Sequence, residues 1–149
     1  LQGDMANLPS SVRPADIVFC INGVGSYAPE LNELAHTISK KTKSCGRISI
    51  SFLNKWSLRR LVRLRFNATE PLQTRGAPPA TDGSLQRLYG RYELKMAFAE
   101  AGFKKISVQS YGLFGGVLQT PGMAKIEREF PKLGHRFGHT IVLTGEKSC

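Results

Sequence analysis

The segment that most constrains the fold is the run Asp-Ile-Val-Phe-Cys-Ile at residues 16–21. Such a run of β-branched and large apolar residues is typical of a strand covered on both faces, as inside a parallel sheet. Residues 29–40 then carry apolar side chains every three or four positions, which predicts a helix. Residues 47–52 alternate between apolar and small polar side chains, which predicts a second strand after a turn at Gly46. The three segments predict a strand–helix–strand unit with parallel strands and a right-handed crossover.

The C-terminal half continues this pattern. Residues 92–101 predict a helix, and residues 105–111 predict a strand. A weaker helical pattern at residues 123–130 ends before Pro131, because proline does not continue a helix. Residues 139–144 are β-branched and predict a last strand. The order of elements indicates an α/β fold with a mainly parallel sheet.

Composition favours one compact domain. Over 149 residues, 41% are hydrophobic and 21% are charged, which is ordinary for a single core. No apolar run approaches the roughly 20 residues that span a bilayer, and the first residues do not resemble a signal peptide, so we expect a cytoplasmic protein. Cys20, Cys45 and Cys149 are odd in number and scattered, which favours buried or idle thiols over a disulfide framework or a zinc site. The histidines lack ligand spacing, so no metal site is predicted.

The net charge of +10 is concentrated in one region, between residues 40 and 65. Residues 56–66 interleave large apolar groups with arginines, which predicts a short basic amphipathic helix. Residues 67–84 are rich in Pro, Gly, Thr and Ala and predict a long loop, of a length often found in active-site lids. We expect the helix to cover the active site with its arginines in water; the alternative is a surface that binds nucleic acid or an anionic membrane.

Ligands of open α/β sheets bind beyond the carboxyl ends of the strands. Residues 22–27 leave the first predicted strand and residues 54–56 leave the second, so their polar and aromatic groups should converge there. The segment at residues 23–28 also fits the glycine pattern G-x-G-x-x-A of a dinucleotide site. No acidic residue ends the following strand to bind a ribose, although Lys55 and Arg59 could bind a 2′-phosphate. An NADP-binding oxidoreductase is therefore the alternative from this pattern.

Three motifs in the same order resemble a known family. Residues 3–9 (Gly-Asp-Met-Ala-Asn-Leu-Pro) precede the strand at 15–20, residues 46–52 follow a helix and a glycine turn, and residues 92–103 precede the strand at 106–108. This series resembles the C-terminal part of the class I S-adenosylmethionine-dependent methyltransferases. The resemblance implies a Rossmann-like three-layer sandwich with a mainly parallel sheet and an antiparallel last strand.

The resemblance also implies roles for individual residues. Asp4 would accept a hydrogen bond from the adenine amino group, and Met5 would pack against the ring. Cys20, Ile21 and Asn22 would line the methionine side of the cofactor, S-adenosylmethionine. Separately from the resemblance, Tyr27, Trp56, Tyr89 and Tyr92 are candidates for the substrate side, and the alternative for such aromatic residues is packing in the core. No fixed catalytic residue is expected, because a sulfonium is already a strong electrophile and positioning can supply most of the catalysis.

One part of the family pattern is missing from residues 1–149. The glycine-rich loop G-x-G-x-G and the acidic residue that binds the cofactor ribose should lie upstream of Leu1. We therefore expect a partial methyltransferase domain at 1–149 that lacks its N-terminal strands and carries a basic helix and a lid-like insertion at about 54–90. The implied reaction is methyl transfer to a small-molecule, lipid or glycan acceptor, with the fragment inactive alone.

Overall fold

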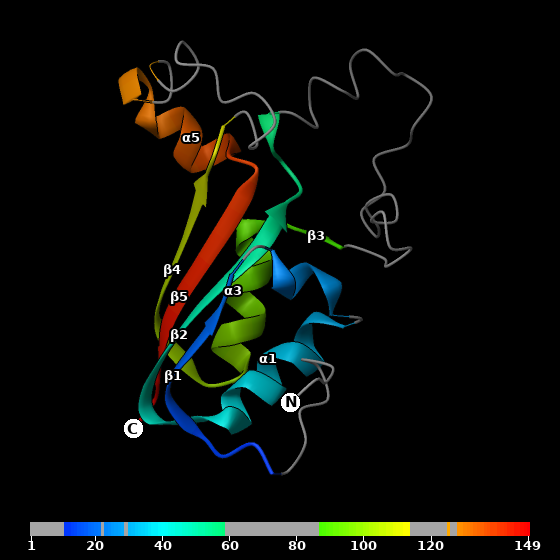
Figure 1. The fold of residues 1–149 in the computed structure, drawn as a ribbon, viewed down its shortest axis with the longest axis vertical. Coiled ribbons are helices and arrows are strands. Elements are labelled where there is room, and N and C mark those ends of the chain that lie inside the picture. Colours follow the sequence, from blue (N-terminus) through cyan, green and yellow to red (C-terminus); the bar gives the residue numbers. More distant parts are fainter. Residues whose placement is uncertain (1–10, 22, 29, 59–86, 114–124, 126–127) are drawn as a thin grey trace.

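A computed structural model describes residues 11–21, 23–28, 30–58, 87–113, 125 and 128–149 (Figure 1). The described elements are, in chain order, β1 (Ala15–Cys20), the 3-10 helix η1 (Val24–Tyr27), α1 (Leu31–Lys41), β2 (Thr42–Asn54), β3 (Leu88–Tyr89), α3 (Arg91–Glu100), β4 (Phe103–Tyr111), α5 (Pro131–Phe137) and β5 (Thr140–Lys147). The predicted basic helix and loop at residues 56–84 fall almost wholly outside the described residues.

The strands form one five-stranded sheet in the order β1-β2-β5-β4, with β3 pairing to the end of β2. β1 and β3 run parallel to β2, whereas β5 runs antiparallel to both β2 and β4. Four strands therefore share one direction and only β5 is reversed. The Rossmann-like α/β class, the mainly parallel sheet and the antiparallel last strand are confirmed.

The core lies between the sheet and helices α1 and α3, which cover the same face (Figure 1). Alternation along β2 directs Ile48, Ile50 and Phe52 into this core, where each is at most 2% exposed. The Phe52 ring meets the Phe98 ring of α3 edge-on, with 6.1 Å between centroids. This packing fixes β2 as the central strand around which the loops at its carboxyl end are arranged.

Both ends of α3 are stabilised by local backbone features. At the start of α3 the Glu93 carboxylate accepts a hydrogen bond from the Gly90 backbone N–H at 3.2 Å, so one of the free donors of the first turn is satisfied. Beyond its end Gly102 adopts φ 94°, a left-handed conformation that glycine takes without strain. Both α1 and α3 lie within two residues of their predicted bounds.

One predicted boundary was wrong, and one helix was not predicted. The turn expected at Gly46 is a bulge inside a longer β2, because the register with β1 jumps from Ala15–Thr42 to Ile17–Arg47. The predicted helix does end before Pro131, since Arg128 and Glu129 are helical and Phe130 is not, but the helix α5 that begins at Pro131 was not predicted. Proline suits a first helical turn because no intrahelical acceptor awaits its missing N–H there.

The expectation of idle thiols was also wrong for two of the three cysteines. Cys45 and Cys149 form a disulfide with 4.7 Å between their Cα atoms, although 104 residues separate them. The antiparallel register pairs Arg47 with Glu146, so the residues just before Arg47 lie beside the chain that follows β5. Strand pairing thus brings Cys45 close to Cys149, and the spacing of cysteines along the sequence does not reveal this pairing.

Candidate functional site at the carboxyl edge of the sheet

The loop after β1 is attached to the end of β2 by two serine hydroxyls. The Gly23 backbone N–H donates to Ser51 Oγ at 2.7 Å, and the Leu53 backbone N–H donates to Ser26 Oγ at 2.7 Å. The Ser26 carbonyl also accepts a hydrogen bond from the Arg87 backbone N–H at 2.7 Å. Because Ser26 is fully buried, these bonds are shielded from water and hold the loop over the carboxyl ends of the parallel strands.

Both glycines of this loop have packing or backbone roles. Gly23 adopts φ 73°, which favours glycine. At Gly25 an added Cβ would lie 2.3 Å from the Phe52 ring, so only glycine allows this approach to the core. The G-x-G spacing that suggested a dinucleotide site is therefore explained by the attachment of this loop to β2.

Asn54 links the end of β2 to two other parts of the edge. Its side-chain amide donates to the Gly138 carbonyl at 2.7 Å and to Ser110 Oγ at 3.4 Å, while its Oδ1 accepts from the Trp56 backbone N–H at 2.9 Å. The side chain is only 1% exposed, and its donors and acceptor are all used. Asn54 therefore fixes the direction in which the chain leaves β2 and, with it, the position of Trp56.

The structure separates the four aromatic candidates for the substrate side. Tyr27 and Trp56 are 43% and 48% exposed at the carboxyl edge, and Lys55 Nζ lies 5.6 Å from the centre of the Trp56 ring. The Tyr89 ring is buried in the core, where it meets Phe52 edge-on with 5.5 Å between centroids. Tyr92 is largely exposed on α3. Tyr27 and Trp56 remain the pair whose rings are accessible on the loops after β1 and β2.

The residues predicted to line the cofactor also differ in whether the structure describes them and in how exposed they are. Asp4, Met5 and Asn22 lie outside the described residues. Cys20 is half-buried and packs against the core, and this burial raises the pKa of its thiol. Ile21 is 52% exposed and offers an apolar side chain directly after β1. Of these candidates, Ile21 is the described residue placed to touch a ligand at this edge.

Two buried hydroxyls near the ends of β2 and β3 have no hydrogen-bond partner within the described part of the chain. They are Ser57 Oγ and Tyr89 OH, both on residues at most 3% exposed. Burial raises the pKa of Tyr89 to about 12, because the phenolate would lose its solvation. The Tyr89 hydroxyl therefore stays protonated over the physiological range.

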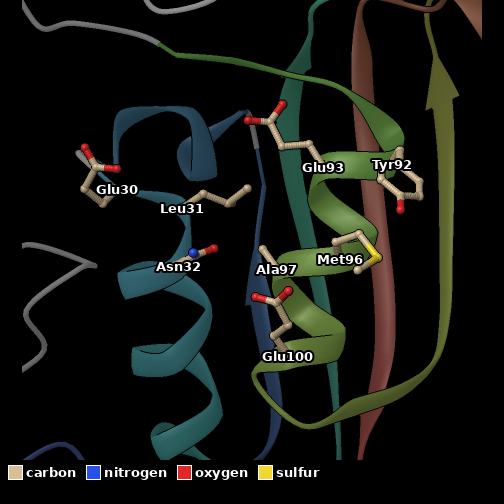
Figure 2. A pocket seen from close by; sticks show the side chains of 8 residues that line it. All are labelled: Glu30, Leu31, Asn32, Tyr92, Glu93, Met96, Ala97 and Glu100. Atoms are coloured by element: carbon tan, nitrogen blue, oxygen red, sulfur yellow. The ribbon is translucent and has the colours of Figure 1, made fainter.

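An open pocket of about 500 Å³ lies between α1 and α3 (Figure 2). Its carboxylates are already engaged in part, since Glu30 pairs with Arg87 at 3.0 Å and Glu93 caps α3. The wall also includes Met96 and Tyr92; apart from Glu30, which directly precedes α1, it takes no other described residue from the loops after β1 and β2. This pocket belongs to the helix layer rather than to the carboxyl edge.

Within the described ranges, no cluster of His, Cys, Asp and Glu is arranged to hold a metal ion. In the same residues, no helix has the length and apolar character needed to cross a membrane. His139 lies at the carboxyl edge, where its carbonyl accepts a hydrogen bond from the Asn54 backbone N–H at 2.9 Å.

Several solved methyltransferases are similar to this structure. A methyltransferase from Thermotoga maritima has a TM-score of 0.65 and 15% identity, over 99% of this chain and 63% of its own. One from Archaeoglobus fulgidus gives 0.56 and 18%, over 99% and 66%. One from Mesorhizobium loti gives 0.61 and 11%, over 97% and 67%. The chain thus spans less than two thirds of the first two structures.

No protein-family model and no curated protein matched the chain. The similar structures above are S-adenosylmethionine-dependent methyltransferases, so they give the NADP alternative no support. Together with the sheet order and the reversed β5, they identify the architecture. The chain has the fold of the class I S-adenosylmethionine-dependent methyltransferases.

Proposed function

We propose that this chain forms part of an enzyme that transfers a methyl group from S-adenosylmethionine to a small-molecule, lipid or glycan acceptor. The observation that carries the proposal is the loop after β1, which Ser26 and Ser51 hold at the carboxyl edge of a sheet with methyltransferase topology. Ligands of open α/β sheets bind at this edge. The resemblance of residues 3–9 to the segment next to the adenine ring points to the same ligand.

The described residues fit one side of such a cofactor. Ile21 and Tyr27 expose apolar surface on the loop after β1, as contact with a thioether or a ring requires. A carboxylate for the ribose hydroxyls does not come from Glu30, which pairs with Arg87, or from Asp16, which pairs with Lys43 at the amino end of the parallel strands. The chain would therefore supply part of the cofactor site, and its own affinity should be low.

The contribution of the chain to the reaction is orientation. When bound, S-adenosylmethionine supplies a methyl group that is already activated by its sulfonium. Trp56 and Tyr27 would hold the acceptor against this methyl group, and alignment of the reacting atoms lowers the barrier without a catalytic triad. Lys55 beside Trp56 would favour an acceptor that carries a carboxylate or a phosphate.

The test is calorimetric titration of S-adenosylhomocysteine into residues 1–149 and into the protein extended upstream to the start codon of its gene. We expect binding by the extended protein and at least tenfold weaker binding by residues 1–149. In the extended protein Ile21→Glu should weaken binding, whereas Met96→Ala, an exposed position on α3, should not. Absence of binding by both proteins, or binding of NADP instead, would remove the proposal.

A further inference from the structure

Basic side chains gather at the end of the sheet opposite the candidate site (Figure 1). The strands β1, β2 and β4 begin at this end, while α1, α3 and β5 finish there. Lys147 Nζ donates to the Thr42 carbonyl at 2.8 Å, and Lys41 Nζ donates to the Val12 carbonyl at 2.8 Å, so these segments lie close together. The charged residues of the described chain at this end are Arg13, Lys40, Lys41, Lys43, Arg47, Lys104, Lys105 and Lys147, against Asp16, Glu100 and Glu146.

The carboxylates at this end neutralise few of the cations. Asp16 pairs with Lys43 at 2.9 Å, and Glu146 pairs with Lys105 at 3.2 Å. The remaining exposed cations, which we call the basic end, form no ion pair or side-chain hydrogen bond within the described ranges: Arg13, Lys40, Arg47 and Lys104. Like charges that gather on one side of a molecule repel one another and attract anions. The basic end is therefore a surface that an anionic partner would stabilise.

Two of these cations have a spacing that suits a particular anion. The strand register places both Arg47 of β2 and Lys104 of β4 opposite Glu146 of β5, one on each side. Neighbouring strands are about 4.8 Å apart, so the two backbones are roughly 10 Å apart across β5. This separation lies between the widths of the minor and major grooves of a nucleic-acid duplex, about 6 and 12 Å. The two side chains can therefore reach phosphates on opposite sides of one groove.

The chemistry of the basic end favours a duplex over other polyanions. Among the described residues at this end no aromatic side chain is exposed, whereas single-stranded nucleic acid is bound by stacking its bases on aromatic rings. The row between Arg47 and Lys104 holds the carboxylate of Glu146, so an anionic bilayer would gain no apolar contact there. Contacts to a phosphate backbone need only Lys and Arg side chains in the right places.

We propose that the basic end binds the phosphate backbone of double-stranded nucleic acid without reading its sequence. The surface lies at the opposite end of the sheet from the loops after β1 and β2 (Figure 1). A bound duplex would thus anchor the protein while the candidate site stays open to its own acceptor. The binding depends on charge alone and requires neither the cofactor nor methyl transfer.

The test is fluorescence anisotropy of a labelled duplex of about 20 base pairs, titrated with the upstream-extended protein in the absence of cofactor. Four phosphate contacts predict that log K falls with log salt concentration with a slope of about −3.6, since each contact contributes about −0.9. Between about 50 and 200 mM salt the affinity should therefore fall roughly 150-fold. DNA and RNA duplexes are compared, and either one binding with this slope supports the proposal and identifies the source of the phosphates.

A pair of neutral substitutions locates the surface. Lys40→Gln combined with Lys104→Gln should make the slope shallower by about 2, because each removes one phosphate contact. The control combines Lys95→Gln on α3 with Lys132→Gln on α5, two exposed positions whose loss lowers the net charge equally. The control should keep the slope of the wild type, and an equal change in both double variants would overturn the proposal.

Two other results would also overturn it. One is a slope that changes only when the arginines at residues 59 and 60 are neutralised, which would assign duplex binding to that segment. The other is binding to vesicles that contain phosphatidylserine but to neither duplex, which would assign the basic end to a membrane surface. Binding of S-adenosylhomocysteine is measured separately, so the proposed function can fail without this inference.

Discussion

Reduction of the Cys45–Cys149 disulfide should strongly lower the stability of the fold. The bridge joins cysteines 104 positions apart, and the closed loop contains most of β2 and all of β3, α3, β4, α5 and β5. In the chain-entropy account, a closed loop of about 100 residues stabilises the folded state by about 4.7 kcal/mol, because it restricts the unfolded chain. Native strain and residual structure reduce this value, so we expect a loss of about 3–4 kcal/mol.

The assay is urea and thermal denaturation of the wild type and of Cys149→Ser, each with and without a phosphine reductant. A loss of 3–4 kcal/mol corresponds to a fall in melting temperature of roughly 6–16 °C for a chain of this size. Reduction should lower the stability of the wild type to that of the Cys149→Ser variant, and it should leave the stability of the variant unchanged. The reasoning is refuted if the two proteins have equal midpoints, or if three thiols react in the unreduced folded wild type.

Three further results follow from the carboxyl edge of the sheet. Gly25→Ala should lower the free energy of unfolding by about 1–3 kcal/mol in urea, because the new Cβ meets the Phe52 ring at 2.3 Å; an unchanged midpoint would contradict this contact. Asn54→Ala removes three side-chain hydrogen bonds at a buried position and should cost about 2–3 kcal/mol, with a shift in Trp56 fluorescence that a purely global destabilisation would not produce in the folded protein. Since the folded pKa of Tyr89 is raised from 10.0 to about 12, its contribution to stability is fully present below pH 10 and is lost between pH 10 and 12. In Tyr89→Phe the free energy of unfolding should fall less steeply between pH 10 and 12. An equal dependence on pH in both proteins would refute the assignment to Tyr89.

The sequence predicted the elements whose patterns are local. The apolar run of β1 and the helical spacing of α1 each follow from neighbours within a few residues, and both occur where expected. In the described part of the sheet, however, β1 is an edge strand whose Ile17 and Phe19 are exposed, so the expected cover on both faces is not seen there. β3 was not predicted, because a two-residue strand exists only through its pairing with the end of β2. The disulfide was missed for a related reason, since it depends on a register between strands far apart in the chain.

The site was predicted in outline but not in its internal connections. Topology correctly brought the loops after β1 and β2 to one edge. The roles of Ser26 and Ser51 were not visible, because a serine near a strand end usually contacts water. Tyr89 was a candidate for the substrate side, yet its ring is buried beside Phe52. Aromatic residues serve both roles, and only the packing distinguishes them.

The position of β5 determines when this protein can fold. β5 is the last described strand along residues 1–149, yet in the sheet it lies between β2 and β4, which have no direct pairing with each other. On the ribosome, β1 and β2 can therefore pair early. In the described sheet β4 pairs with β5, so it has no strand partner until residues 140–147 have emerged. Deletion of residues 140–147 would leave β2 with an open edge and β4 detached, so a small deletion would carry a large risk of aggregation.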